Sequence, residues 1–337
     1  MDTKELLSAI EDELKRQVAR LDEPRTKPFH DMLAYHMGWI GEGAGPAATG
    51  KRIRPTMLLL TVAACDGASA AKWLYAVPAA AAVELVHNFS LVHDDIQDNS
   101  EKRRGRTTTW KIVGAPMAIN VGDALFVMSN QAMMDLKEHY PAEIVLQAAK
   151  VLHNTCLDLT RGQFLDMSYE KRNDLDVEDY WPMVAGKTAA LLSTCCHIGA
   201  ILGGADEGKQ DAYRSFGHAL GMAFQVQDDI LGIWGDEALT GKSAASDLLE
   251  GKKSLPVLHG LVQKGKFAER WGKGPIQPDE VEEMANLLAN EGAYEATYAL
   301  SEQMTTLALN NLREADPQGE AGEALFELAN KLLKREQ

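Results

Sequence analysis

Two aspartate clusters are the residues whose types and spacing point most directly to chemistry. Asp94, Asp95 and Asp98 lie in LVHDDIQDNSEKRRGR, and Asp228 and Asp229 lie in GMAFQVQDDILGIWGD. Each cluster follows an apolar stretch typical of a helix, on which residues four apart share one face. Like charges at that spacing destabilise a bare helix, whereas a bridging Mg2+, which prefers oxygen ligands, would offset that cost. The pattern predicts two carboxylate clusters that face each other across a helical cavity and hold Mg2+ on a diphosphate ester. The alternative is a solvated acidic helix face.

Basic residues next to the first cluster could bind phosphate. Arg103 and Arg104 in RRGR carry guanidinium groups that suit phosphate oxygens, and Lys51 and Arg54 in GKRIRP follow small residues at a helix entry. His87 lies seven residues before Asp94, on the same helix face, where it could reach a phosphate near Lys51. The alternatives are a solvated basic loop and a core histidine.

A second set of polar residues accompanies the second aspartate cluster. Lysines follow it in a glycine-containing loop, a Lys-Thr pair opens another helix after a glycine, and a glutamine precedes it. Acids on a helix with lysines on the next loop would form a second metal-plus-phosphate half-site, with surface polar residues as the alternative. These residues are Lys187, Thr188, Gln225, Lys242, Lys252 and Lys253, together with Gln163 and Asp166 on another helix.

Composition limits the class of protein. The chain has 337 residues, 45% of them apolar, which suffices for a large core. A net charge of −15 argues against nonspecific nucleic-acid binding. The start of the chain lacks the apolar run of a signal peptide, and no stretch of about 20 uncharged apolar residues suggests a membrane span. Cys65, Cys156, Cys195 and Cys196 have no CxxC spacing and are expected to be reduced thiols.

Hydrophobic periodicity predicts an all-α protein that forms one domain over residues 1–337. Apolar residues recur at three-to-four spacing, and strand-like alternation is scarce. Glycine, proline and charged residues mark three loops, at Gly41–Gly50, Ile233–Lys253 and Lys264–Pro278. The expected helices include Glu5–Leu21, Thr56–Cys65, Val77–Val92, Ala118–Lys137, Ile144–Arg161, Ala189–Leu202, Gln210–Ile230 and Glu280–Leu288.

Taken together, these motifs resemble the trans-type isoprenyl diphosphate synthases, or polyprenyl synthetases, and most of all geranylgeranyl diphosphate synthases. The resemblance runs from about Gly50 to Pro256, with GKRIRP, HNFSLVHDDIQD, RRGR, GQFLD, KT, FQVQDD, GK and GKKSLP in the family's order. It implies a single large helical bundle around a central cavity, a homodimer, and a cytoplasmic enzyme that uses about three Mg2+ ions.

The resemblance also implies a role for each matching residue. Asp94, Asp98 and Asp228 would bind Mg2+, supported by Asp95 and Asp229. Isopentenyl diphosphate would be held by Lys51, Arg54, His87 and Arg104. The allylic diphosphate would be held by Arg103, Lys187, Thr188, Gln225, Lys242 and Lys252.

One position departs from the family pattern. The second motif is usually DDxxD, but here Gly232 replaces the last acid, and Asp236 lies four residues further on. Asp228 is retained, so catalysis is expected to survive. The departure puts the geometry or affinity of the third Mg2+ in doubt.

The implied mechanism is ionisation, condensation and elimination, without a side-chain nucleophile. Phe89 lies five residues before Asp94, roughly 7.5 Å down the helix at 1.5 Å per residue, and small Ser90 follows it. The chain has an aromatic residue five positions before Asp94 and two residues between the acid pair and Asp98. This combination resembles the pattern of family members that make C20 products. We therefore predict a C20 product with Phe89 as the floor of the cavity. A longer product would pass if Phe89 points elsewhere.

Two other readings share parts of the pattern. A class I terpene cyclase also ionises a prenyl diphosphate with Mg2+, and the altered second motif slightly favours it. It needs no isopentenyl diphosphate pocket, so Lys51, Arg54, His87 and Arg104 favour the synthase. A noncatalytic subunit of a heteromeric synthase would not need the retained acids. The product would partition into membranes, so transient bilayer contact is expected without stable insertion.

Overall fold

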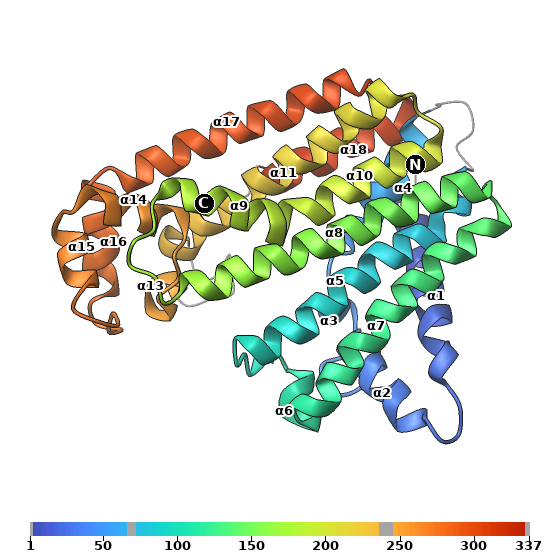
Figure 1. The fold of residues 1–337 in the computed structure, drawn as a ribbon, viewed down its shortest axis with the longest axis horizontal. Helices are drawn as coiled ribbons and strands as arrows, with labels where there is room; N and C mark the ends of the chain where they lie inside the picture. The colour runs from blue at the N-terminus through green and yellow to red at the C-terminus, as the bar shows by residue number, and fades with distance from the viewer. Residues whose placement is uncertain (1–2, 66–71, 236–244, 334–337) are drawn as a thin grey trace. The chain divides into compact units, whose positions relative to one another are not determined.

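The computed structural model of the protein describes residues 3–65, 72–235 and 245–333 (Figure 1). These residues form helices almost throughout, which confirms the predicted all-α class. Within the described ranges, the strands are the two-residue segments β1 (Lys102–Arg103) and β2 (Arg106–Thr107), which pair antiparallel. No disulfide joins the four cysteines, all of which lie within the described residues. The chain divides into two compact units, each of which is described by itself.

Unit 1 comprises Met1–His153, Cys195–Gln210 and Asp316–Leu325. Its central helix, α5, is buried along most of its length, and it contacts α1, α4 and α7. A run of alanines in the first half of α5 allows this close packing, and Pro78 lies in its first turn. The elements that lie wholly within residues 3–153 are α1 (Thr3–Val18), η1 (Ala19–Leu21), α2 (Lys27–His36), α3 (Pro46–Thr49), α4 (Ile53–Ala64), η2 (Lys72–Ala76), α5 (Val77–Gln97), β1, β2, α6 (Thr109–Val113), α7 (Ala115–Asp135) and η3 (Leu136–Glu138).

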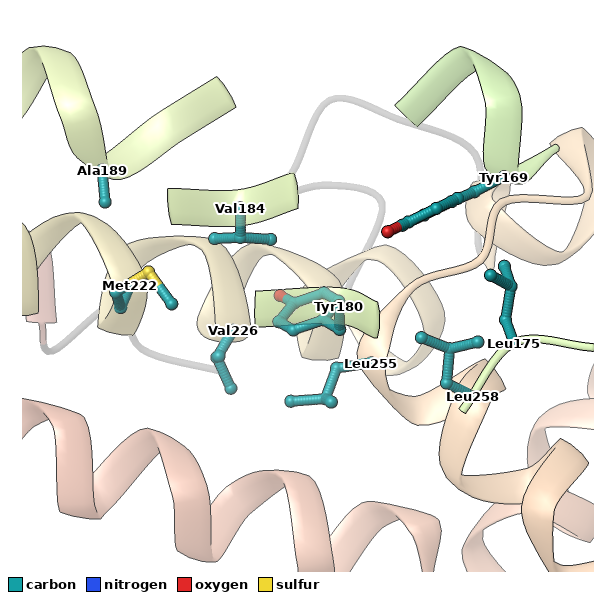
Figure 2. Packing of buried hydrophobic residues seen from close by; sticks show 9 residues of the cluster. All are labelled: Tyr169, Leu175, Tyr180, Val184, Ala189, Met222, Val226, Leu255 and Leu258. Atoms are coloured by element: carbon teal, nitrogen blue, oxygen red, sulfur yellow. The ribbon is translucent and has the colours of Figure 1, made fainter. Parts of the chain in front are cut away.

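Unit 2 comprises Asn154–Thr194, Asp211–Ala315 and Phe326–Gln337. Its core includes Tyr180, Val184, Val226 and Leu255, which pack between helices far apart in the sequence (Figure 2). Its elements include α9 (Val177–Val184), the π-helical turn η4 (Ala185–Ala189), α13 (Ser246–Glu250), α14 (Leu255–Gln263), α15 (Lys266–Trp271), α16 (Val281–Asn290) and α17 (Ala293–Glu314). Four helices have residues in both units: α8 (Ala142–Tyr169), α10 (Ala190–Gly203), α11 (Glu207–Trp234) and α18 (Gly319–Leu333).

The predicted loops contain more helix than expected. Helix α3 lies inside Gly41–Gly50, where Pro46 begins a single turn, and α15 lies inside Lys264–Pro278. Phe267 anchors α15 because its side chain is fully buried. The expectation of uninterrupted loops was wrong there, since flanking glycines and prolines hid one- and two-turn helices. Of Ile233–Lys253, the part at 236–244 lies outside the described residues.

Two helical segments are long and apolar enough to cross a membrane by length and composition alone. They are Lys72–Gln97 and Val177–Gly203. In each, 67% of the most apolar window is buried within the protein, as in a core helix. Length and composition are therefore weak grounds for a membrane span here.

Candidate active site

The first aspartate cluster lies at the C-terminal end of α5. Asp94 is partly buried, Asp98 is the C-cap, and Asp95 is 2% exposed. The Nε of Arg103, in the β1–β2 hairpin, donates to Asp95 Oδ1 at 2.7 Å. Burial raises the pKa of Asp95 to about 6 against the opposing effect of Arg103, and nearby Asp94 and Asp98 raise it further. Asp95 is therefore a buried partner of Arg103 within the motif. Asp94 and Asp98 lie one turn apart on one face of α5.

Basic groups gather in the same unit. Arg54 Nη1 lies 3.4 Å from His87 Nε2. Burial, then the charges of Arg54, Arg104 and Arg103, lower the pKa of His87 well below its ordinary value, so the imidazole is neutral. Lys51 is exposed at the start of the segment that carries Arg54. The structure thus brings Arg54 and His87 together.

Arg104 contacts the segment that carries Lys51. Its Nη1 donates to the carbonyls of Ala48 and Thr49, each at 2.9 Å. Gly50 has φ +83°, and a Cβ there would lie 2.7 Å from Arg104 Cζ. Only a residue without a side chain allows the guanidinium to approach the backbone so closely.

The contacts of Arg52 could not be predicted from the sequence. It is 3% exposed and adopts a left-handed conformation, φ 48°. Its Nε donates to Glu11 Oε1 at 2.6 Å, and its Nη1 donates to Glu84 Oε1 at 2.7 Å. Asn88 Nδ2 donates to the same oxygen of Glu84 at 3.0 Å. This buried network fixes the segment between Lys51 and Arg54 to α1 and α5.

Unit 2 holds a cavity of about 190 Å³ that is lined by the second set of predicted residues. Lys187 and Thr188 come from η4, Gln225 and Asp228 from α11, and Lys252 from the segment after α13. The cavity also has lining residues that the sequence reasoning missed, for which no motif gave a signal. These are Tyr180, Met183, Val184, Asp247 and Ser254.

A hydrogen-bonded chain orders the acids of this cavity. Thr188 Oγ1 donates to Gln225 Oε1 at 2.8 Å, and Gln225 Nε2 donates to Asp229 Oδ1 at 2.9 Å. The backbone N–H of Leu255 donates to Asp229 Oδ2 at 2.9 Å. Burial raises the pKa of Asp229 to about 7 in spite of these donors, and the charge of Asp247 adds to the rise. Asp229 is therefore an internal support, whereas Asp228 is partly exposed beside it.

Lys187 is positioned by a close crossing of η4 and α8. Its Nζ is paired with Asp166 on α8. A Cβ at Gly162 would lie 2.6 Å from the carbonyl carbon of Gly186, and a Cβ at Gly186 would lie 2.6 Å from the carbonyl oxygen of Asp158. Turns of π-helix often mark functional sites. Two glycines thus let the turn that carries Lys187 and Thr188 rest on α8.

The donor set suits Mg2+, which takes carboxylate, water and phosphate oxygens. Within the described residues, no group of three or more His, Cys, Asp or Glu side chains converges on one ion position. A metal held here would therefore need further oxygens from a phosphate ligand or water. Lys252 is paired with Glu250 at 2.6 Å. Lys242 and Asp236 lie outside the described residues.

The predicted chain-length residues lie on α5, one turn from the first aspartate cluster. The Phe89 ring packs against Phe126 on α7, with centroids 5.0 Å apart, and against His93 at 5.6 Å. Ser90 Oγ donates to the carbonyl of His87 at 2.8 Å. Phe89 is thus held in place by neighbouring rings.

Comparison with known proteins identifies the class. The model of the polyprenyl synthetase family matches residues 45–288. A geranylgeranyl diphosphate synthase of Mycobacterium tuberculosis is 41% identical over 251 residues, which cover 74% of this chain and 70% of the relative. A (2E,6E)-farnesyl diphosphate synthase of Mycobacterium bovis is 33% identical over 95% of this chain and 89% of the relative. The crystal structure of a polyprenyl synthetase from Streptomyces coelicolor A3(2) superposes with a TM-score of 0.86, at 36% identity and 98% coverage of both chains.

The chain belongs to the polyprenyl synthetase family. More particularly, it is a trans-prenyltransferase of the isoprenyl diphosphate synthase type, similar to geranylgeranyl diphosphate synthases. This supports the chain-elongating reading over the cyclase and the noncatalytic subunit. Relatives named for different chain lengths leave the product length open.

Proposed function

We propose that this prenyltransferase condenses isopentenyl diphosphate with an allylic diphosphate to give an all-trans C20 product, geranylgeranyl diphosphate. The observation that carries the elongating role is the basic group in unit 1. Arg54, His87 and Arg104 are drawn together around a segment that also presents Lys51. Such a set suits a second diphosphate, which a cyclase does not bind.

We assign the remaining roles by resemblance. Asp94, Asp98 and Asp228 bind Mg2+, with about three ions when substrate is present. Bound Mg2+ would stabilise negative charge on the departing diphosphate. Arg103 and Lys242 bind the allylic diphosphate, as do the residues that line the unit 2 cavity, namely Lys187, Thr188, Gln225 and Lys252.

The reaction then needs no side-chain nucleophile. The C–O bond of the allylic ester breaks, and its electron pair leaves with the diphosphate. The double bond of isopentenyl diphosphate attacks the allylic carbon, and a proton passes to the released diphosphate. Apolar side chains such as Phe89 exclude water, which would otherwise capture the cation.

We propose further that the enzyme acts in the cytoplasm as a homodimer and binds neither nucleic acid nor membrane stably. Helix α7 supports the dimer, because Ile119, Val127 and Met134 are exposed apolar residues at positions seven or eight apart. That spacing places them on one face of the helix.

Product analysis tests the proposal. Purified protein is incubated with Mg2+, isopentenyl diphosphate and, separately, C5, C10 and C15 allylic diphosphates, and the dephosphorylated products are identified by mass. A C20 prenol from the C15 primer is expected. A longer prenol would retain the class and discard the C20 assignment, whereas a hydrocarbon from an allylic diphosphate alone would establish a cyclase.

A further inference from the structure

The basic motif after the first aspartate cluster contains three arginines, and the third has no role in the proposed function. Arg103 lies on β1 and Arg106 lies opposite it on β2, so Arg104 and Gly105 form the two-residue turn of the hairpin. Both turn residues have positive φ, which is 51° for Arg104. A residue with a side chain keeps this conformation only where its surroundings hold it there. The contacts that hold the hairpin therefore also decide where Arg104 points.

The guanidinium of Arg106 is bound by protein groups. Three of its nitrogens donate to three backbone carbonyls in the segment Tyr35–Glu42, which ends α2 and leads toward α3. Nη1 donates to Tyr35 and Nη2 to Ile40, each at 2.7 Å, and Nε donates to Glu42 at 2.9 Å. The Cζ of Arg106 also lies 4.0 Å from the centroid of the Tyr35 ring, as in a cation–π contact. These contacts use three of the five N–H groups of the side chain.

The same segment binds the hairpin in return. The hydroxyl of Tyr35 donates to the carbonyl of Thr107, on β2, at 2.8 Å. Gly41 makes room for this arrangement, because a Cβ there would lie 2.7 Å from Tyr35 Cδ2 and 3.3 Å from Arg106 Nη2. The segment after α2 is thus shaped around the side chain of Arg106.

The opposed arginines of the hairpin are held from two sides. Like charges directly opposite each other on neighbouring strands destabilise the pair. Here Arg103 is bound to Asp95 on α5, whereas Arg106 is bound to the segment that follows α2. Arg104, in the turn between them, is therefore fixed by the partners of both strands.

We propose that Arg106 is a positioning residue for isopentenyl diphosphate, which fixes the hairpin so that Arg104 meets the same diphosphate as Lys51 and Arg54. The segment that Arg106 binds continues along the chain to Lys51 and Arg54, so Arg106 ties together the two parts of this site. Arg106 itself does not bind the substrate. The inference rests on the proposed function, because Arg104, Lys51 and Arg54 are assigned to isopentenyl diphosphate there.

The test measures KM for each substrate with the full chain, Mg2+, isopentenyl diphosphate and the C15 allylic diphosphate, well below the Tm of each variant. Arg106→Met should raise KM for isopentenyl diphosphate by at least about tenfold, since a misplaced binding group can cost as much as about a hundredfold. KM for the allylic diphosphate should rise much less, because Arg103 keeps its bond to Asp95. A general loss of structure would not favour one substrate over the other.

Two further variants test the geometry and the charge. Arg106→Lys should behave like Arg106→Met, because a lysine ammonium does not reproduce the planar fork that reaches three carbonyls. Lys102→Met is the matched control, because it removes one positive charge from an exposed residue of the same hairpin. It should leave both KM values unchanged.

Tyr35→Leu separates positioning from a direct contact with substrate. It removes both the ring beneath Arg106 and the hydroxyl bound to Thr107, so it should raise the same KM. The double variant Tyr35→Leu/Arg106→Met should raise KM by less than the product of the two single effects, because both changes break one arrangement. A wild-type KM in Tyr35→Leu would indicate that Arg106 contacts the substrate and would overturn the inference.

The inference would also fail, while the proposed function stands, if Arg106→Met left KM for isopentenyl diphosphate unchanged or raised both KM values equally. A wild-type protein that elongates no primer would overturn the proposed function. Calorimetric titration with isopentenyl diphosphate would then decide the inference, and an equal Kd for the wild type and Arg106→Met would refute it.

Discussion

Phe89 is the side chain that we propose sets the product length. Its ring contacts the rings of Phe126 and His93, with centroids 5.0 Å and 5.6 Å apart. Aromatic pairs in such edge or tilted contacts are worth about 0.5–1.5 kcal/mol beyond the area that they bury. A ring at this place, one turn from the acids that we propose bind Mg2+, would block a growing chain at a defined depth.

Phe89→Ala should therefore lengthen the product by one or more isoprene units. Mass analysis of the dephosphorylated products provides the measurement. Ile112→Ala, which changes an exposed residue on α6, is the control and should leave the product unaltered. An unchanged product from Phe89→Ala would remove Phe89 as the floor.

His36 should give the protein a measurable dependence on pH. Burial, with the charges of Arg103 and Arg104, lowers its pKa to about 3 from an ordinary value near 6.5. Below pH 6.5 the imidazole of His36 binds a proton in the unfolded chain but not in the folded chain. The free energy of unfolding therefore falls as the pH falls from about 6.5 toward 3. At about 1.4 kcal/mol per pKa unit, the loss by pH 5 is at most about 2 kcal/mol.

The measurement is the free energy of unfolding at pH 7 and pH 5. His36→Gln should flatten the difference, whereas His153→Gln, at an exposed position, should not. An equal slope in wild type and His36→Gln would contradict the assignment to His36.

At the scale of residues, the site residues that belong to a motif with a defined spacing could be predicted from the sequence. Residues outside such motifs could not. Asp94 and Asp98 carry a spacing that a helix converts into one face, and Asp228 belongs to a second pair of adjacent acids. Asp247 belongs to no such motif, because its place beside Gly232 results from a contact between two helices. The pairing of Arg52 with Glu84 was hidden for the same reason.

Helix crossings, at the next scale, place the side chains of the candidate site. The crossing of η4 and α8 depends on Gly162, because the backbone around Gly186 occupies the space of a side chain. Gly162→Ala should push away the turn that carries Lys187 and Thr188. We expect KM for the allylic diphosphate to rise at least several-fold.

KM for isopentenyl diphosphate, measured in the same assay, should change little, because the residues proposed to bind it belong to unit 1. Gly208→Ala, on an exposed first turn of α11, is the control and should alter neither constant. An unaffected allylic KM in Gly162→Ala would show that η4 tolerates the displacement.

The buried network on α5 offers a test of stability. Glu84→Leu leaves the charge of Arg52 with Glu11 as its remaining acidic partner. Breaking a buried ion pair costs about 3–5 kcal/mol, so the free energy of unfolding should fall by about 3 kcal/mol. Circular dichroism during urea denaturation measures this change.

The double variant Arg52→Met/Glu84→Leu should recover part of the loss, because no charge then remains buried alone. Asp12→Asn, exposed on α1, is the control. Equal free energies of unfolding for Glu84→Leu and the wild type would contradict the contribution to stability that we assign to this network.

Long helices were predictable from periodicity, whereas short ones were not. Helices such as α5 and α11 repeat apolar residues over many turns, so their existence followed from the sequence. Helices α3 and α15 have one or two turns, too few for a period to show. Their formation depends on tertiary burial, as for Phe267 in α15.

For the whole molecule, the proposed homodimer gives a direct measurement. The chain has a mass of 36.8 kDa, so light scattering after gel filtration should report twice that value. Val127→Asp puts a charge on the apolar face of α7 and should shift the protein toward the monomer. Leu307→Asp, at an exposed position on α17, is the control. A wild-type mass of one chain would refute the dimer.

The domain organisation and the product length were harder to predict. The class of protein could be predicted because several motifs occur in the family's order, and each is assigned a contact with a chemical group that the family's substrates share. We propose that product length depends on one or two apolar side chains such as Phe89, and relatives of this chain are named for different product lengths. The single domain predicted over residues 1–337 stays a prediction beside the two compact units.

The contact between Gly50 and Arg104 has a consequence for the evolution of this enzyme. Any side chain at position 50 would meet the guanidinium and strain a backbone that has φ +83°. In a library that randomises this codon, selection for prenyl product should return glycine almost alone, even though the position touches no substrate in our assignment. The flanking exposed Lys51 should tolerate arginine, because its contribution is a charge and not a shape.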